Sequence, residues 1–328
     1  MNRTKSQLKV VTKPSTELAA LVDEFLETYQ TRGLSPKSRD IASNTLTRLV
    51  LPWAAKNGLA SAADLNQTAI DAFSRHLQQE HKTHMTGKPL SPDSVRTYMR
   101  TLKTFVRWAQ QQGEFGGVKV PMPKAHERVL EVLSVKEMRA IEKAAPSKRD
   151  SLIIRLLADT GMRLGELLGL RRDDLMKERD GRTTNTFVRI REGKGGKVRT
   201  VPIPPDLYAR LKDYSERPEA REAITNKLFT TDRRRKDGQY GALTGRSVQQ
   251  LVKYAAMRAG VERRVHPHAF RHAALTRMVN QGMPVDHIRR IAGHADLDLI
   301  VKTYSHVRPT DLYNSYLDML RREEDSQD

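Results

Sequence analysis

Apolar residues in the first third of the chain recur at helical spacing. They form four groups, at residues 18–29, 46–53, 70–77 and 95–109. Such spacing is typical of helices that each bury one face. Ser35 and Ser91 each precede a proline, a combination that marks a helix N-terminus, here of the second and fourth helices. We therefore expect a unit of four helices over residues 15–115, after a flexible arm at residues 1–14.

The pattern changes after this unit. Residues 116–133 carry glycine, proline and positive charge without helical periodicity, which predicts a linker. Ser134 and Glu137 then form a capping box that opens a second unit with further helices. Alternating apolar and polar residues on both sides of a glycine-rich turn at 193–196 predict a β-hairpin. The sequence thus favours a mainly α fold with a small antiparallel β-sheet (α+β), whose second unit spans residues 134–310.

The charge of the chain points to a polyanionic partner. Its 58 Lys and Arg against 39 Asp and Glu give a formal net charge of +19, and 38% hydrophobic residues suffice for packed cores. Nucleic acid is the leading candidate, although a merely cationic enzyme or a ribosome-associated protein would carry the same charge. The absence of cysteine excludes disulfides and thiolate chemistry. Because neither a signal peptide nor a membrane-spanning segment is evident, we expect a cytoplasmic protein.

Five short segments of the second unit carry residues suited to chemistry. They are Arg163 in TGMRLGELLGL, Lys194 in GKGGK, His268 and Arg271 in HPHAFRH, His294 in IAGH, and Tyr304 in TYSHV. Taken singly, each has a structural explanation: Arg163 can pair with Glu166 three residues on, and Tyr304 can simply pack. The histidines of HPHAFRH lack the acidic companions of a zinc hydrolase site, so we expect no metal.

In this order, the five segments resemble the active-site series of the tyrosine recombinase (phage integrase) family, of the Xer and integrase type. The resemblance covers the second unit as a catalytic domain, and the helical first unit is similar to the family's core-binding (SAM-like) domain. One spacing departs from the pattern, since Tyr304 follows His294 by ten residues where many members have nine. The context TYSHV favours Tyr304 as nucleophile over Tyr313 and Tyr316, whose neighbours have the spacing of a packed helix.

The resemblance implies a site-specific DNA recombinase that cuts and rejoins DNA through a 3′-phosphotyrosyl bond to Tyr304, without metal, ATP or any other cofactor. Arg163 and Arg271 would bind the scissile phosphate through planar forks of N–H donors, a geometry that lysine cannot reproduce. Negative charge builds up on that phosphate during attack, and the two arginines would stabilise it.

The remaining residues would handle protons. His268 would accept the proton of the tyrosine hydroxyl, and His294 would donate a hydrogen bond. Lys194 would protonate the departing 5′ oxygen, with Lys197 as the alternative. Glu166 would orient one of the basic groups.

Further basic residues are expected to bind DNA from the second and fourth predicted helices and from the hairpin. They are Lys37, Arg39, Arg48, Arg96, Arg100, Lys103, Arg107 and Lys197. The expected partners are double-stranded recombination sites and three further copies of the chain, forming a homotetramer on two sites from free monomers, with accessory DNA-bending proteins. A C-terminal helix and tail at residues 311–328 would be exchanged between protomers.

Two other functions remain open: a non-catalytic DNA-binding regulator on the same scaffold, and a type IB topoisomerase-like enzyme. A regulator has no need of a nucleophile, and a topoisomerase would relax DNA without pairing two sites. Integration, excision and resolution of a mobile element are not distinguished by the sequence.

Overall fold

The computed structural model of the chain separates into two compact units, Met1–Val129 and Leu130–Asp328. The structure describes residues 17–83, 86–124, 132–191, 198–218, 223, 225–234, 236–293, 313 and 317. Within these residues the fold is mainly helical with one three-stranded antiparallel sheet. The predicted fold class is therefore confirmed.

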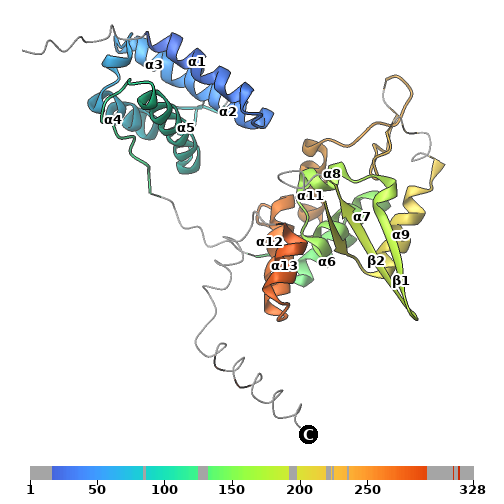
Figure 1. Cartoon of the computed structure of the whole chain (residues 1–328). Helices are drawn as coiled ribbons and strands as arrows, with labels where there is room; N and C mark the ends of the chain where they lie inside the picture. Colours follow the sequence, from blue (N-terminus) through green and yellow to red (C-terminus); the bar gives the residue numbers. More distant parts are fainter. Residues whose placement is uncertain are drawn as a thin grey trace, which may run out of the picture. The chain divides into compact units, whose positions relative to one another are not determined.

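The first unit is built from four helical segments (Figure 1). Their bounds are α1 Leu18–Thr31; α2 Pro36–Thr45, continued by the π-helical turn η1 Leu46–Val50 and by α3 Leu51–Lys56; α4 Gln67–Arg75, continued by η3 His76–Glu80; and α5 Pro92–Gln111, with a short 3-10 turn η2 Ala62–Asp64. The hydroxyls of Ser35 and Ser91 each accept a hydrogen bond of 3.2 Å from the backbone N–H three residues on. The two predicted N-caps are therefore confirmed.

An aromatic cluster fills the core of this unit. The ring centroid of Phe25 lies 5.4 Å from those of both Phe105 and Trp108. Part of the segment expected to be a linker also packs here, since Val120 is buried and the N–H of Lys119 donates to the Gln67 side chain at 2.8 Å. The first unit therefore includes residues beyond its last helix.

The second unit combines a small sheet with helices (Figure 1). Its elements are α6 Val135–Lys143, α7 Lys148–Thr160, α8 Leu164–Gly169, η4 Arg172–Asp174, β1 Leu175–Asp180, β2 Thr183–Ile190, β3 Arg199–Pro202, α9 Pro205–Ser215, α11 Gly245–Arg258, α12 Pro267–Asn280 and α13 Val285–Ala292. The predicted capping box at Ser134 and Glu137 opens α6. Among the described helices, not one combines the length and apolar character that a membrane crossing requires.

The sheet has the order β1-β2-β3, with antiparallel neighbours. Val188 in the central strand pairs with Leu175 on one side and Val201 on the other, and Ile190 pairs with Arg199. The hairpin of β2 and β3 was predicted, but β1 was not. Four of the six residues of β1 are exposed, so its sequence lacks the alternation that marks a half-buried strand.

Helix α12 packs against α7. Gly161 ends α7 with a φ of +61°, in the left-handed region that glycine adopts without strain. A Cβ at this position would lie 3.1 Å from the Cβ of Ala274, tighter than ordinary packing. Glycine thus permits both the turn that leads to Arg163 and the close approach of α12.

Candidate active site

Arg163 and Glu166 form an ion pair at the start of α8. The Nη1 of Arg163 donates to Oε1 of Glu166 at 2.8 Å, and the Arg163 backbone N–H donates to Oε2 at 2.8 Å. A second arginine, Arg199 at the start of β3, donates to the same two oxygens from Nη1 and Nη2 at 2.9 and 2.7 Å. One carboxylate therefore joins two guanidinium groups, giving the cluster a net charge of about +1 at neutral pH.

The carboxylate of Glu166 is buried and ionised. Its side chain is 3% exposed, compared with 13% for Arg199 and 25% for Arg163. Burial by itself would raise the pKa of Glu166, but hydrogen bonds from Arg199 and from the backbone and side chain of Arg163 hold that pKa below its usual range. The pair foreseen from the spacing of Arg163 and Glu166 is thus present, together with a partner that the sequence did not indicate.

Arg271 lies on α12 with only 1% of its surface exposed. Its Nη1 donates to the carbonyl of Gly161, in the turn before Arg163, and its Nη2 donates to the carbonyl of Ala292 at 2.7 Å. Both contacts cross between elements, from α12 to the end of α7 and to the end of α13. Arg271 therefore fixes the segment that carries Arg163 relative to the end of α13.

Gly293 brings the end of α13 against the arginines. A Cβ on this residue would lie 3.4 Å from Cζ of Arg199 and 3.5 Å from Nη1 of Arg163, and its φ of +79° favours glycine independently. The Nε of Arg199 also donates to the carbonyl of Ile291 at 2.9 Å. The residue that follows Gly293 in the chain is His294. The segment that carries this predicted site residue thus begins beside Arg163.

His268 is exposed on the first turn of α12, which begins at Pro267. Its ring lies edge-on to that of His272 one helical turn on, with centroids 4.8 Å apart, and stacks with His266 at 6.5 Å. Burial lowers the pKa of His266, and the positive charge of Arg264 lowers it further. Among the described residues, no group of three or more His, Asp or Glu side chains could hold a metal ion.

Four predicted site residues lie outside the described residues: Lys194, Lys197, His294 and Tyr304. Both flanks of the hairpin that carries the lysines are described. Arg191, just after β2, pairs with Asp174 through Nε and with Asp173 through Nη2 at 2.7 Å. The C-terminal segment 311–328 is likewise described only at Tyr313 and Leu317, both helical, with Tyr313 63% exposed.

The basic residues expected to bind DNA from the first unit are mostly exposed. Arg96 is the exception: it is partly buried, and its Nη1 donates to the carbonyl of Pro123 at 2.9 Å. The exposed ones are Lys37, Arg39, Arg48, Arg100, Lys103 and Arg107. Arg96 therefore also holds the chain that leaves this unit, a structural role that the sequence did not reveal.

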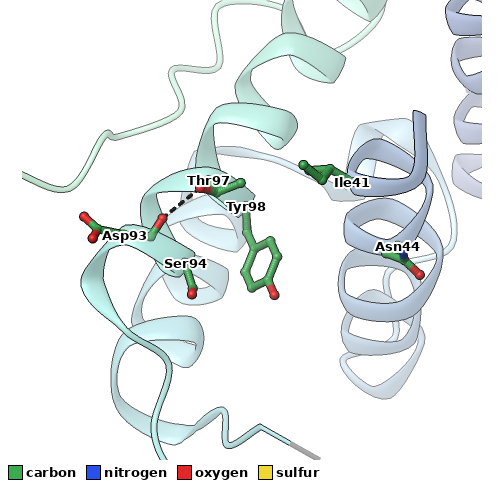
Figure 2. Close-up of a pocket in the computed structure, with 6 residues that line it drawn as sticks. All are labelled: Ile41, Asn44, Asp93, Ser94, Thr97 and Tyr98. Carbon is green, nitrogen blue, oxygen red and sulfur yellow. Dashed lines mark hydrogen bonds between the residues drawn. The ribbon is translucent and has the colours of Figure 1, made fainter. Parts of the chain in front are cut away.

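A hollow of about 360 Å³ opens between α2 and α5, the two helices that carry most of these basic residues (Figure 2). Its lining consists of Ile41 and Asn44 from α2 and Asp93, Ser94, Thr97 and Tyr98 from α5. The hydroxyl of Thr97 donates back to the carbonyl of Asp93 at 2.8 Å, as Figure 2 shows. Four of the six lining residues thus have polar side chains, and Tyr98 adds an aromatic ring.

Arg199 is the site residue that sequence inspection missed. It lies only five residues after Lys194, but nothing in a strand that alternates polar and apolar residues distinguishes a structural arginine from a solvated one. The one available signal was its place near the start of the strand that follows the glycine-rich turn.

The chain is similar to known proteins in sequence and in fold. A model of the phage integrase family matches residues 131–311. The tyrosine recombinase XerA of Thermococcus onnurineus (strain NA1) is 33% identical over 283 residues, which cover 84% of this chain and 88% of the relative. Tyrosine recombinase XerC 2 of Ralstonia nicotianae is 29% identical over 272 residues, covering 79% of this chain and 74% of the relative.

Solved structures share the fold. The XerH recombinase in a post-cleavage complex with a palindromic difH substrate matches with a TM-score of 0.66 and 18% identity, covering 90% of this chain and 83% of that one. A lambda integrase tetramer bound to a Holliday junction matches with a TM-score of 0.64 and 18% identity, covering 89% and 78%. The match to the family model and the XerA relative show that the chain belongs to the phage integrase family of tyrosine site-specific recombinases.

Proposed function

We propose that this chain cleaves and rejoins double-stranded DNA at specific sites through a covalent bond between Tyr304 and a DNA 3′ phosphate. The observation that carries the proposal is the convergence of family motifs far apart in the sequence. Arg163 and the end of α13 meet at Gly293, and Arg271 bonds to the backbone next to both. The groups expected to bind the phosphate thus come from three segments held by direct contacts.

The two arginines supply the positive charge that the reaction needs. When an oxygen nucleophile attacks a phosphodiester, negative charge builds up on the non-bridging oxygens, and preorganised cations stabilise it. Arg163 is a quarter exposed, so DNA can reach it, and its carboxylate partner fixes its orientation. Arg271 is held by two backbone carbonyls, so its orientation beside the turn that leads to Arg163 is fixed before DNA binds.

The proton transfers in this proposal use the roles that the family resemblance implies. The Tyr304 oxygen attacks phosphorus and gives its proton to His268, while the bond to the 5′ oxygen breaks and that oxygen takes a proton from Lys194 or Lys197. His294 donates a hydrogen bond to the phosphate. Rejoining runs the same steps in reverse with a 5′ hydroxyl as nucleophile, so the energy of the DNA linkage is kept in the phosphotyrosyl bond.

The first unit supplies DNA affinity in this proposal. The exposed basic residues of α2 and α5 contact phosphates, which makes binding depend on salt. Four protomers assemble from monomers on two sites and exchange their C-terminal helices, with accessory DNA-bending proteins setting the geometry. The lambda integrase tetramer on a Holliday junction supports this assembly by analogy.

The test uses wild-type protein and Tyr304→Phe with DNA fragments from either side of the encoding gene, nicked near candidate break sites so that cleavage is trapped. Denaturing gels without added metal detect covalent protein–DNA adducts. We expect a 3′-linked adduct with wild type only, while Tyr304→Phe binds the same DNA. Adducts with both proteins would move the nucleophile to Tyr313 or Tyr316.

A second assay separates recombination from relaxation. A supercoiled plasmid carrying two copies of the bound site should be rearranged, giving deletion or inversion products. Relaxation without rearrangement would favour the topoisomerase-like alternative. Binding without an adduct on any trapped substrate would favour the non-catalytic regulator.

A further inference from the structure

Arg199 joins three segments of the second unit through a single side chain. It extends from β3 to Glu166 on α8, 33 residues away in the sequence, and to the carbonyl of Ile291 on α13, 92 residues away. Its guanidinium is also the group that a Cβ on Gly293 would touch, at 3.4 Å. Arg199 therefore lies where β3, α8 and α13 meet.

The two arginines share Glu166 unequally. Arg199 donates from both terminal nitrogens, one to each carboxylate oxygen, whereas the Arg163 side chain donates to Oε1 at 2.8 Å. Arg199 is also the less exposed of the two, at 13% against 25%. A forked contact to both oxygens is the geometry that best neutralises a carboxylate. Arg199 is thus the main counter-ion of Glu166.

We propose that Arg199 is a positioning residue that neutralises Glu166 and thereby leaves the positive charge of Arg163 for the DNA phosphate, an inference that rests on the proposed function. Glu166 is needed to orient Arg163, but its negative charge would cancel that of Arg163 if the two formed an isolated pair. With Arg199 present, two positive charges face one negative charge, and the cluster keeps a net charge of about +1. Arg199 thus lets Arg163 be both oriented and charged.

A purely mechanical role makes a different prediction. If Arg199 only tied β3 to α8 and α13, its fork geometry would matter and its charge would not. Removing Glu166 as well would then loosen the site further. If the charge balance matters, replacing Glu166 by neutral glutamine restores the net charge of +1 that loss of Arg199 removes. The glutamine carbonyl can still accept the hydrogen bonds of Arg163.

The experiment compares Arg199→Met, Arg199→Lys and the double variant Glu166→Gln/Arg199→Met in single-turnover cleavage of the nicked substrates. We expect Arg199→Met to slow adduct formation about 100-fold, the size of loss seen when one transition-state donor is removed. The double variant should recover at least about tenfold of this loss, and Arg199→Lys should stay within about fivefold of wild type because it keeps the charge. Circular dichroism confirms that each variant is folded at the assay temperature.

Arg191→Met provides the matched control. Arg191 flanks the same hairpin on its other side. It likewise pairs with a buried carboxylate, that of Asp174, which is 1% exposed. Among the observed contacts, Arg191 has none with Glu166. We expect Arg191→Met to slow cleavage less than about fivefold. Two results would overturn the charge-balance proposal. One is an Arg191→Met variant that forms the adduct as slowly as Arg199→Met does. The other is a double variant, or an Arg199→Lys variant, that forms it no faster than Arg199→Met does.

A binding readout separates this proposal from the proposed function. The same substitutions are placed in Tyr304→Phe protein, and affinity for the site is measured by mobility shift at fixed salt. Arg199→Met should weaken binding about tenfold, and adding Glu166→Gln should restore it. Restored DNA affinity supports the charge balance even if the wild type forms no covalent adduct. The missing adduct would refute only the covalent mechanism. Absence of restoration overturns the charge balance even if cleavage is observed.

Discussion

The two units bury different kinds of polar group. Among the described residues, the first unit buries only neutral polar side chains, those of Thr45, Ser74 and Thr101. The second unit buries four charged ones, those of Asp150, Glu166, Asp174 and Arg271. A buried charge is costly unless it is paired and hydrogen-bonded. The second unit therefore accepts a cost in stability that the first unit avoids.

The partners of these buried groups differ in the same way. The hydroxyls of Thr45 and Thr101 donate to carbonyls four residues earlier in their own helical segments. Glu166 and Arg271 instead bond to residues on other elements. The first unit can thus satisfy the hydroxyls of Thr45 and Thr101 as each helix forms, whereas Glu166 and Arg271 gain their contacts to other elements only when several elements have assembled. The candidate active site thus lies in the unit with long-range polar contacts.

The largest expected effect is on the apolar core of the first unit. Phe105 is fully buried and touches the rings of Phe25, Trp108 and Phe115. Phe105→Ala should lower the free energy of unfolding of this unit by about 3–5 kcal/mol, the usual cost of removing a buried aromatic ring. The loss should be independent of pH between 5 and 8. Tryptophan fluorescence measures it selectively, because both tryptophans, Trp53 and Trp108, lie in this unit.

Thr101→Val is the matched control on the same helix. Its hydroxyl bonds only within α5 as far as the observed contacts go, so its removal should cost about 1 kcal/mol or less. A loss as large as that of Phe105→Ala would mean that buried hydroxyls hold the first unit together, and the contrast between the units would fail.

The apolar pattern predicted the scaffold well and the sheet only in part. Helices such as α5 were foreseen because serine caps and spaced apolar residues act within one segment. The β2–β3 hairpin was foreseen for the same local reason. Strand β1 was missed because its exposed, charged residues carry no alternation, and only pairing with β2 makes it a strand. Local signals therefore predict elements, and they fail where an element depends on its neighbour.

The candidate site shows the same contrast between local signals and long-range contacts. The Arg163–Glu166 pair was foreseeable because three residues separate its members on one helical turn. The Arg199–Glu166 pair was not, because its members are 33 residues apart and become neighbours only through the fold. The carbonyl contacts of Arg271 are equally long-range, and no side-chain motif encodes a backbone acceptor. Motif order identified the candidate residues, but not the contacts that hold them.

A smaller effect should come from the buried carboxylate of the second unit. Glu166→Gln leaves Arg163 and Arg199 without a negative partner and should lower the free energy of unfolding by about 2 kcal/mol at pH 7. The pKa of Glu166 is held below its usual range in the fold, so its carboxylate stabilises the fold above the unfolded pKa of about 4.3. That contribution is lost as pH falls through the lower, folded pKa. The difference between wild type and variant should therefore shrink below about pH 4.

Denaturation followed by far-UV circular dichroism and by tryptophan fluorescence measures this effect at several pH values. The dichroism transition of the second unit should shift with pH, while the fluorescence transition should match wild type. A shift in both signals would show that the units share one cooperative transition. A difference that stays constant down to pH 3 would contradict the assigned role of the carboxylate.

The smallest effect should come from a single exposed charge of the first unit. Arg100 on α5 is exposed and has no observed ion pair among the described residues, so Arg100→Ala should leave the free energy of unfolding unchanged. If Arg100 contacts one phosphate, its loss should weaken the salt dependence of DNA binding. The slope of the logarithm of the DNA association constant against the logarithm of the salt concentration should become less steep by about 0.9, measured by mobility shift over a salt series. Lys56→Ala, at the end of α3, is the control with equal charge loss, and its slope should stay that of wild type. Equal slopes for the two variants would show that net charge alone, rather than the face formed by α2 and α5, directs this unit to DNA.

Arg96→Ala should differ from both variants. It also removes the hydrogen bond to the Pro123 carbonyl, so it should lower the free energy of unfolding as well as the affinity for DNA.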